Sequence, residues 1–102
     1  MPAADSHSRD PGLLVLISLA DGPKHGHAII QDVTEFAGIR LGPGTLYGAL
    51  ARLEEAGWIA ALPTEGRRHP YRLTKTGQAA LRTRLTGLDT AVRVGLGRIT
   101  AS

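Results

Sequence analysis

Three short segments of the chain carry side chains suited to contacting a polyanion. Residues 24–27 combine one lysine with two histidines, and residues 67–69 are Arg-Arg-His. Between them, the stretch 42–57 offers one arginine, a threonine and a tyrosine beside several glycines. Cations and N–H donors contact phosphates, whereas hydroxyl and guanidinium groups also contact base edges. The pattern predicts a site for double-stranded DNA formed by Lys24, His25, His27, Gly44, Thr45, Tyr47, Gly48, Arg52, Arg67, Arg68 and His69.

Some of these residues also have a plainer interpretation. Tyr47 fits a half-buried core aromatic as well as a groove contact. Arg52 fits an ion pair with Glu54 or Glu55 on a solvated helix face. The arginines at 67–68 fit the soluble tip of a hairpin that contacts nothing. The position of each side chain in the fold decides between these alternatives.

Several kinds of chemistry are not predicted. His25 and His27 lie two apart, so on a helix they point in different directions and do not share a metal ion. The chain has no cysteine, which removes thiolate zinc sites and a cysteine nucleophile. It contains no Gly-x-Ser-x-Gly, no His-Glu-x-x-His and no P-loop. Residues 42–48 resemble a dinucleotide-binding loop, but the last glycine comes one residue late and no strand precedes them. We predict no enzyme, no metal and no cofactor.

The charge of the chain is concentrated in its last third. The 102 residues carry a net charge of +3, with a pI near 10.0. Of the 12 Lys and Arg residues, those after residue 66 face only one acid, Asp89; they are Arg67, Arg68, Arg72, Lys75, Arg82, Arg84, Arg93 and Arg98. Such a pI is expected of a nucleic-acid binder, although a basic domain that binds nothing anionic has the same composition.

No segment of the sequence predicts contact with a membrane. The longest apolar run, 13–17, is far too short to span a bilayer. The polar residues 1–10 do not resemble a signal peptide, and we predict that they form a disordered lead-in. A cytoplasmic, nucleoid-associated protein is expected.

The first half of the chain predicts three helices. Asp10 and the proline after it start a helix that is apolar on nearly all sides and ends before the turn 20–23. A second helix is expected from about Lys24 or His25 to Phe36, followed by a short link. The third helix, 42–57, has an apolar stripe of Leu46, Leu50 and Leu53. This spacing is typical of a helix-turn-helix, whose second helix enters the major groove.

After residue 57 the periodicity changes to that of strands. Residues 58–62 and 71–74 predict a β-hairpin whose connecting segment carries the basic residues 67–69. Pro70 cannot donate to a ladder, so its strand is expected at a sheet edge. A helix-turn-helix followed by a basic hairpin is a winged helix. The fold class is therefore mainly α with a small β-hairpin, with a winged domain at 11–74.

The remaining residues, 75–102, predict one long helix that packs against another chain. Thr74 is a plausible N-cap, and the helix is expected to run toward Arg98. Its apolar residues recur at nearly heptad spacing, with Gly95 at one missing position: Leu81, Leu85, Leu88, Val92 and Ile99. Such a seam favours a partner helix, most simply that of a second copy.

Three blocks of the sequence, 19–29, 41–59 and 66–77, closely resemble the PadR-like transcriptional regulators. They include Lys-His-Gly-His at 24–27, Gly-Pro-Gly-Thr-Leu-Tyr-Gly at 42–48 and Gly-Arg-Arg-His-Pro-Tyr at 66–71. The likeness covers roughly residues 11–90. The joint occurrence of the blocks in this order is specific, whereas each block alone is weaker. The length resembles the smaller branch of the family.

The resemblance implies a dimeric winged helix-turn-helix repressor of bacterial type, bound to an inverted-repeat operator. Its dimer contact would involve the last helix and the first, through Leu14, Leu81, Leu85, Leu88 and Val92. Some members sense small aromatic or drug-like molecules near these helices, but an apolar seam needs no ligand to account for it.

The chain departs from the family pattern in three ways. His27 replaces an aromatic residue, Gly48 replaces a proline, and the predicted wing is short. These departures bear on the details of phosphate contact and base preference. The rival interpretation is a winged-helix module that binds protein, or an anti-repressor, without contacting DNA.

Overall fold

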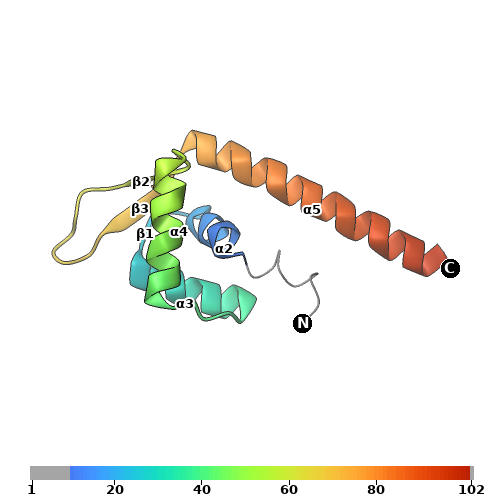
Figure 1. Cartoon of the computed structure of the whole chain (residues 1–102), viewed down its shortest axis with the longest axis horizontal. Coiled ribbons are helices and arrows are strands. Elements are labelled where there is room, and N and C mark those ends of the chain that lie inside the picture. Colours follow the sequence, from blue (N-terminus) through green and yellow to red (C-terminus); the bar gives the residue numbers. More distant parts are fainter. Residues whose placement is uncertain (1–9, 102) are drawn as a thin grey trace.

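The chain alternates helices with three short strands before it ends in a long helix. The computed structural model describes residues 10–101. Its elements are α2 (Pro11–Leu19), β1 (Lys24–His25), α3 (Gly26–Ala37), α4 (Pro43–Glu55), β2 (Ile59–Ala61), β3 (Pro70–Leu73) and α5 (Lys75–Ala101). The elements from α2 to β3 gather at one end, and α5 extends away from them (Figure 1). The predicted fold class is confirmed. Of the lead-in predicted for residues 1–10, residues 1–9 lie outside the described residues, whereas Asp10 is the N-cap of α2 and does not belong to a disordered segment.

Helix α2 is the centre of the core. Six of its nine residues are buried, as expected for a helix that is apolar on almost every side. It contacts α3, α4, α5 and β3. Asp10 caps it as predicted, because its Oδ1 accepts hydrogen bonds from the N–H groups of Gly12 at 2.9 Å and Leu13 at 3.3 Å. The position of α2 therefore fixes how the other helices sit relative to one another.

Helix α4 begins and ends where the glycines of the sequence predict. Gly42 is the N-cap and a proline follows it. At the other end Gly57 adopts φ 80°. Its N–H donates to the Glu54 carbonyl at 3.0 Å, and the N–H of Trp58 donates to the Leu53 carbonyl at 3.0 Å. These bonds form a Schellman cap, which favours glycine. The side that faces α2 buries Leu46, Ala49, Leu50 and Leu53.

The sheet has one strand more than the predicted hairpin. Its three antiparallel strands are ordered β1-β3-β2. Lys24 and His25 form β1 and pair with Tyr71 and Pro70 of β3. Helix α3 therefore begins at Gly26 and not at Lys24 or His25. Each boundary predicted for the two hairpin strands also shifts by one residue. A strand of two residues has no periodicity from which it could be predicted.

The prediction that Pro70 lies on an edge strand is wrong, because β3 is the central strand. Pro70 pairs with His25 on one side, and on the other its carbonyl accepts a hydrogen bond from the N–H of Leu62 at 2.9 Å. Pro70 is the first residue of β3. At that position the missing N–H interrupts no ladder, so a central strand can begin with proline.

Residues 62–69, here called the wing, connect β2 to β3 and project from the sheet (Figure 1). Their tip is a tight turn in which the backbone N–H and C=O groups of Glu65 and Arg68 exchange hydrogen bonds, both 3.0 Å long. Gly66, the first central residue, has φ 64°. A two-residue hairpin turn requires positive φ there, which glycine adopts at little cost. The wing is thereby held as an ordered hairpin.

Helix α5 starts at the predicted cap and leaves the body of the protein. The Oγ1 atom of Thr74 accepts a hydrogen bond from the N–H of Gly77 at 3.0 Å. Gly77 lies so close to Trp58 that a Cβ added to it would be 1.9 Å from the Trp58 carbonyl oxygen. Leu81 and Leu88 then pack on the core. From residue 89 onward every described residue is exposed, and the molecule reaches 57 Å in its longest dimension.

Among the helices between residues 10 and 101, not one has the length and hydropathy of a membrane-spanning segment.

Candidate nucleic-acid interface

The amino end of α3 combines two histidines with free backbone donors. His25 is the N-cap, and its Nδ1 accepts a hydrogen bond from the N–H of Ala28 at 3.3 Å. A neutral His25 in this arrangement carries its proton on Nε2, which remains a donor. His27 is exposed in the first turn. A helix N-terminus with such neighbours is suited to holding a phosphate.

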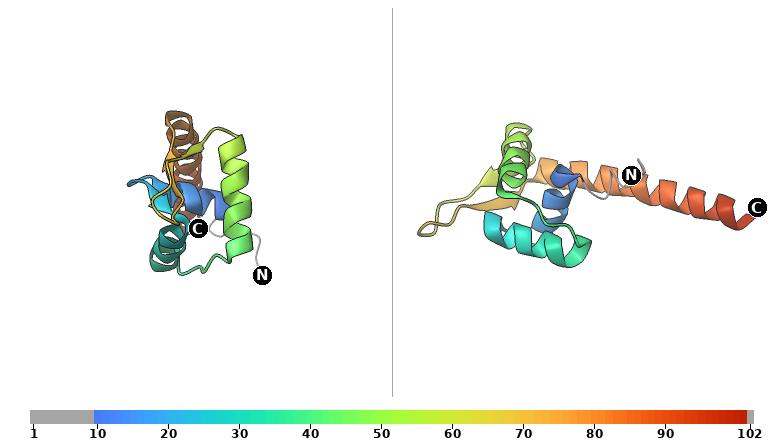
Figure 2. Two further views of the ribbon diagram at one scale, coloured as in Figure 1. Left: turned by 90° about the vertical axis from the view of Figure 1, so that its left-hand side faces the viewer. Right: turned by 60° about the horizontal axis from the view of Figure 1, so that its bottom comes forward.

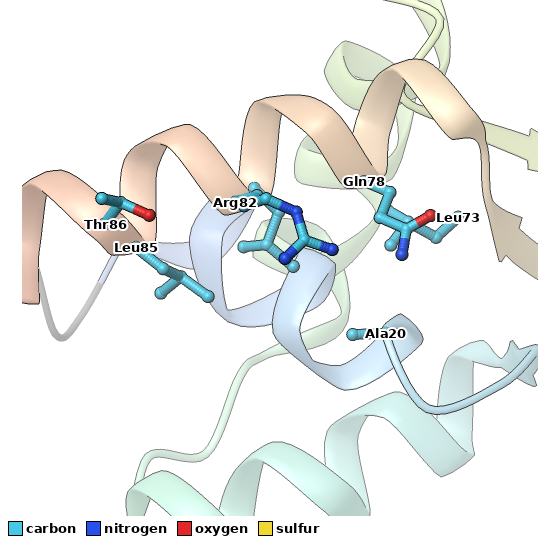
Figure 3. A pocket seen from close by; sticks show the side chains of 7 residues that line it. Ala20, Leu73, Gln78, Arg82, Leu85 and Thr86 are labelled. Atoms are coloured by element: carbon cyan, nitrogen blue, oxygen red, sulfur yellow. The ribbon is translucent and has the colours of Figure 1, made fainter.

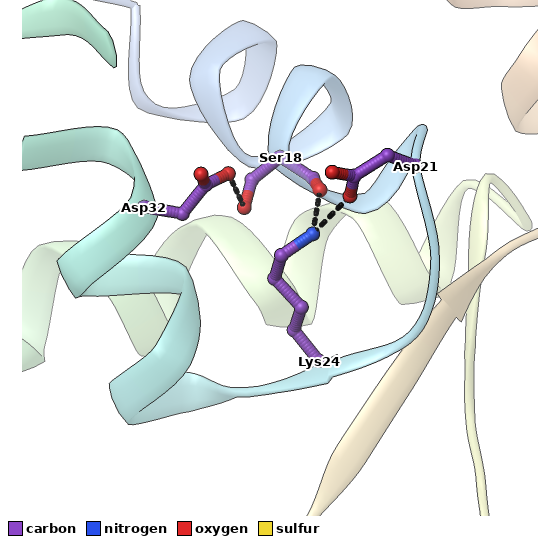
Figure 4. A network of polar contacts seen from close by, with 4 residues as sticks. All are labelled: Ser18, Asp21, Lys24 and Asp32. Atoms are coloured by element: carbon purple, nitrogen blue, oxygen red, sulfur yellow. Dashed lines mark hydrogen bonds and ion pairs between the residues drawn. The ribbon is translucent and has the colours of Figure 1, made fainter. Parts of the chain in front are cut away.

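Lys24 has a different environment from the one predicted for a phosphate contact. Its Nζ donates hydrogen bonds to the Ser18 carbonyl at the end of α2 and to the carboxylate of Asp21 (Figure 4). Its side chain is only 18 % exposed. The hydrogen bond and charge of Lys24 lower the pKa of Asp21 below its ordinary value of 3.8. Lys24 thus links β1 to the end of α2, and its role as a phosphate contact stays a prediction.

The same network reaches α3. The Ser18 hydroxyl donates a hydrogen bond of 2.7 Å to the Asp32 carboxylate (Figure 4). Ser18 is 2 % exposed and is the buried polar residue of an otherwise apolar helix. Because a buried hydroxyl needs a partner, this bond fixes α3 relative to α2. The lone serine within the otherwise apolar run 13–19 is the signal of this contact in the sequence.

The predicted base-reading residues lie on the outer side of α4. Gly44, Thr45, Tyr47 and Arg52 are exposed, and Gly48 is half-buried. None of them takes part in the contact of α4 with the core, which uses the leucine stripe. The outer side of α4 therefore offers a hydroxyl, a phenol and a guanidinium above a backbone that small residues leave accessible.

Tyr47 is a surface residue, but it also touches α3. It is 54 % exposed, and a Cβ added to Gly26 would lie 3.0 Å from its phenol oxygen. Partial burial, reinforced by the nearby Glu54 carboxylate and Tyr47 phenol, raises the pKa of Tyr71 above its ordinary value of 10.0. Tyr47 thus stands where α4, the start of α3 and strand β3 meet. Its hydroxyl therefore lies beside the amino end of α3.

Arg52 does not form the ion pair that was its plainer interpretation. Within residues 10–101 the ion pairs join Lys24 to Asp21, Arg84 to Asp10 and Arg93 to Asp89, and none involves Arg52. The guanidinium instead lies over Gly48, with Nη1 3.5 Å from the position that a Cβ would occupy there.

The wing presents its cations to solvent. Arg67, Arg68 and His69 are all exposed, and no described side chain is paired with them. Seen from the wing end of the molecule, α4 stands to one side of the wing (Figure 2). A DNA duplex contacted by the outer side of α4 is therefore within reach of a neighbouring basic hairpin, as winged-helix geometry requires.

The predicted dimer residues divide into two groups. Leu14 and Leu81 are 3 % and 5 % exposed, so they belong to the core of the chain itself and offer almost no surface to a partner. Leu88 is partly buried against the same core. Leu85 and Val92 are 39 % and 56 % exposed. The seam predicted from the heptad spacing is thus internal at its start and accessible further along.

A hollow of about 330 Å³ lies beside α5 where it passes the end of α2. Figure 3 shows Leu73 and Leu85 with Gln78 and Arg82 around it, above Ala20. Its lining is of mixed polarity and consists of Ala20, Leu73, Leu81 and Leu85 with Gln78, Arg82 and Thr86. Leu85 belongs both to this hollow and to the exposed seam, so the two form one continuous surface.

Helix α3, the link 38–42, α4 and a basic hairpin define a winged helix-turn-helix protein of the class that binds DNA. The chain belongs to the family described as the transcriptional regulator PadR-like family, whose sequence profile matches residues 14–83. Members of this family regulate transcription and are not enzymes. Between residues 10 and 101 no three potential metal ligands come together.

Two relatives support this assignment. The transcriptional regulator Rv3488 of Mycobacterium tuberculosis is 38 % identical over 88 residues, which cover 83 % of this chain and 81 % of the relative. An uncharacterised 37.1 kDa protein of transposon TN4556 from Streptomyces fradiae is 49 % identical over 74 residues. The match covers 72 % of this chain but 21 % of that protein. This chain therefore spans about a fifth of the transposon protein's length.

Solved structures of regulators share the fold. A transcriptional regulator of Clostridium thermocellum superposes with a TM-score of 0.77 at 25 % identity, covering 92 % of this chain and 94 % of its own. A PadR family regulator of Clostridium difficile gives 0.75 at 25 % identity, with 82 % and 92 % covered.

Proposed function

We propose that the chain is a homodimeric repressor of transcription that binds double-stranded DNA sequence-specifically. Helix α4 enters the major groove, the amino end of α3 meets the phosphate backbone, and the wing contacts phosphates or the minor groove. The observation that carries the proposal is the shared exposure of His27, Tyr47, Arg52 and the wing cations on neighbouring elements. Lys24 supports this surface from beneath.

The dimer forms through α5. Its exposed apolar residues require a cover that residues 10–101 of one chain do not supply, and a second copy provides an identical seam. Two-fold symmetry places two copies of α4 on two half-sites, so the operator is an inverted repeat. A dimer bound across a promoter occludes it, which accounts for repression.

We assign the hollow in Figure 3 to dimer closure and not to an effector. Its lining continues the seam through Leu85, and the seam needs no ligand to account for it. The expected result is that small aromatic acids and drug-like aromatics do not release the protein from its operator. Release by any of them at micromolar concentration, measured by fluorescence anisotropy, contradicts the assignment.

The test of DNA binding is a titration of DNA from upstream of the chain's own gene at several salt concentrations. Several phosphate contacts give a log–log slope of about −0.9 for each, and footprinting should show two symmetric half-sites. A DNA fragment of scrambled sequence is the control. Failure to bind at low salt with dimeric protein contradicts the proposal and favours a protein-binding winged helix.

A further inference from the structure

Arg52 and Gly48 form a unit on the outer side of α4. They lie four residues apart and therefore on neighbouring turns of one helix face. A Cβ added to Gly48 would lie 3.5 Å from the Nη1 atom of Arg52, and that is the only contact within 4 Å found for such an atom. The guanidinium is folded back along the helix onto the space that glycine leaves.

The direction in which the Arg52 side chain bends determines which part of α4 its guanidinium lies beside. Side chains of a helix lean toward its N-terminus, and the N-terminal half of a recognition helix contacts base edges. Arg52 begins in the third turn of α4, which starts at residue 43. Lying over Gly48, its guanidinium is carried about one turn, roughly 5 Å, toward the N-terminal end.

The donors of Arg52 are also uncommitted. The side chain is exposed, and within residues 10–101 it has neither an ion pair nor a hydrogen bond, although Glu54 and Glu55 are close in sequence. Arginine holds five N–H donors in a planar fork that matches the O6 and N7 atoms of guanine in the major groove. Gly44, one turn before Gly48, leaves open space beside it.

We propose that Arg52 reads a guanine in each half-site and that Gly48 is the residue that lets it do so. This inference rests on the proposed function, because it requires α4 to enter the major groove. It assigns to Arg52 a role in specificity, whereas the wing and α3 supply contacts to phosphates. A side chain larger than alanine at position 48 displaces the Arg52 guanidinium and removes the preference for guanine over other bases.

The first experiment compares wild-type protein with Arg52→Ala. Half-site preferences are measured by selection from randomised operators, and affinities are measured for the preferred operator and for one with the guanine replaced. Arg52→Ala is expected to lose preference at one guanine position per half-site, by roughly 5- to 150-fold. The salt dependence should not change, because a base contact releases no counterion from a phosphate. An unchanged melting temperature verifies that the exposed substitution leaves the fold intact.

The second experiment tests the role of Gly48 with two substitutions. Gly48→Ala should keep the guanine preference, because 3.5 Å is an ordinary contact distance for the added methyl group. Gly48→Leu should abolish it. In the Arg52→Ala background, Gly48→Leu should cause no further loss of preference, since the residue it acts through is gone. Preference is taken as a ratio of two affinities, so general obstruction of the groove by leucine cancels.

Two results overturn the inference while leaving the proposed function intact. One is a uniform loss of affinity in Arg52→Ala with a salt slope shallower by about 0.9, which identifies a phosphate contact. The other is wild-type binding in Arg52→Ala, which removes the residue from the interface. A wild-type protein that binds no DNA at low salt contradicts the proposed function itself and, with it, this inference.

Discussion

The wing and the distal half of α5, residues 89–101, are the two parts of the molecule that project furthest from the body, and they expose opposite kinds of side chain. They lie at opposite ends of the molecule (Figure 1). The wing exposes Arg67, Arg68 and His69 on a hairpin closed by a tight turn. The distal half of α5 exposes Val92 and Leu96, the latter by 60 %.

The difference indicates which partner each end requires. A charged hairpin is stable in water and makes additional favourable electrostatic interactions where it contacts an anion. Exposed apolar surface costs about 25 cal/mol per Å², so a helix that keeps a row of it favours another protein surface. Substitutions in the wing are therefore expected to change DNA affinity without changing association, whereas those in the distal half of α5 act first on association and change DNA affinity only through it.

The largest effect, on the free energy of unfolding, is expected where α5 packs on the body of the protein. That junction connects the wing end of the molecule to the distal half of α5. In Gly77→Ala the new methyl group overlaps the Trp58 carbonyl, and α5 must move. The hydrogen bond of 3.0 Å from the Thr74 N–H to the same carbonyl is also lost. We expect the free energy of unfolding to fall by about 3 kcal/mol or more, measured by chemical denaturation.

Gly87→Ala is the matched control in the same helix. A Cβ there meets nothing within 4 Å, so the change should stabilise α5 by up to about 1 kcal/mol through helix propensity. Equal effects of the two substitutions would show that Gly77 is not a packing contact.

The next largest effect is expected for Val92→Asp, which places a carboxylate in the proposed seam of each copy. Burying an unpaired charge is costly, so the dissociation constant of the dimer should rise by roughly 100-fold or more. Operator affinity should fall with it, because a monomer reaches only one half-site. Sedimentation and anisotropy measure the two effects.

Val94→Asp tests whether position or mere loss of a valine matters. Val94 is exposed as well, but it lies about 200° around the helix from Val92. A dimer that is weakened equally by both substitutions is not held together by the predicted seam.

A smaller effect is expected at the other end of the molecule. Arg67→Ala combined with Arg68→Ala should weaken binding to all DNA sequences alike, by roughly 10- to 100-fold, and should make the salt slope shallower by about 1.8. The dimer should be unaffected. Arg93→Ala with Arg98→Ala removes the same charge from the distal half of α5 and should leave the salt slope almost unchanged. If the two double variants behave alike, net charge and not the wing determines binding.

The sequence predicted these two ends unequally well. The wing followed from Gly66 and the adjacent basic residues, since turn chemistry and charge are local properties. The apolar spacing of α5 was also visible, but it continues from Leu81 to Ile99 with one gap at Gly95. Periodicity does not distinguish a leucine that packs on its own α2 from one that awaits another chain. Only the fold shows that Leu81 is buried in the core, whereas Val92 is exposed.

Contacts between distant segments account for most of what the sequence did not predict. The two-residue strand β1 exists only because β3 lies beside it. Lys24 had the residue type of a phosphate contact, but the Ser18 carbonyl in α2 and the Asp21 carboxylate in the following turn accept its hydrogen bonds. Within α4, by contrast, the outward position of Thr45 and Arg52 followed from helical geometry, because 3.6 residues per turn fix the faces of a capped helix. The position of Tyr47 stayed open until the fold showed it exposed.

The smallest effect is expected for the ion pair that ties the start of α2 to α5. Partial burial raises the pKa of Asp10, but the hydrogen bond and charge of Arg84, together with the N–H groups of Leu13 and Gly12, outweigh it and bring the pKa below 3.8. Because the folded-state pKa is lowered, the stabilisation is fully present above the unfolded-state pKa and is lost as the pH falls through the folded-state value.

Asp10→Asn isolates this pair, since asparagine still caps the helix but does not attract Arg84. At pH 7 the variant should lose about 0.5 kcal/mol of unfolding free energy, as is typical of a half-exposed ion pair. The difference from wild type should vanish in acid, where Asp10 is protonated. Urea denaturation between pH 7 and pH 2 measures it. A difference that persists below the folded-state pKa would assign the effect to the cap and not to the charge. The contact between Asp10 and Arg84 would then contribute nothing to the free energy of unfolding.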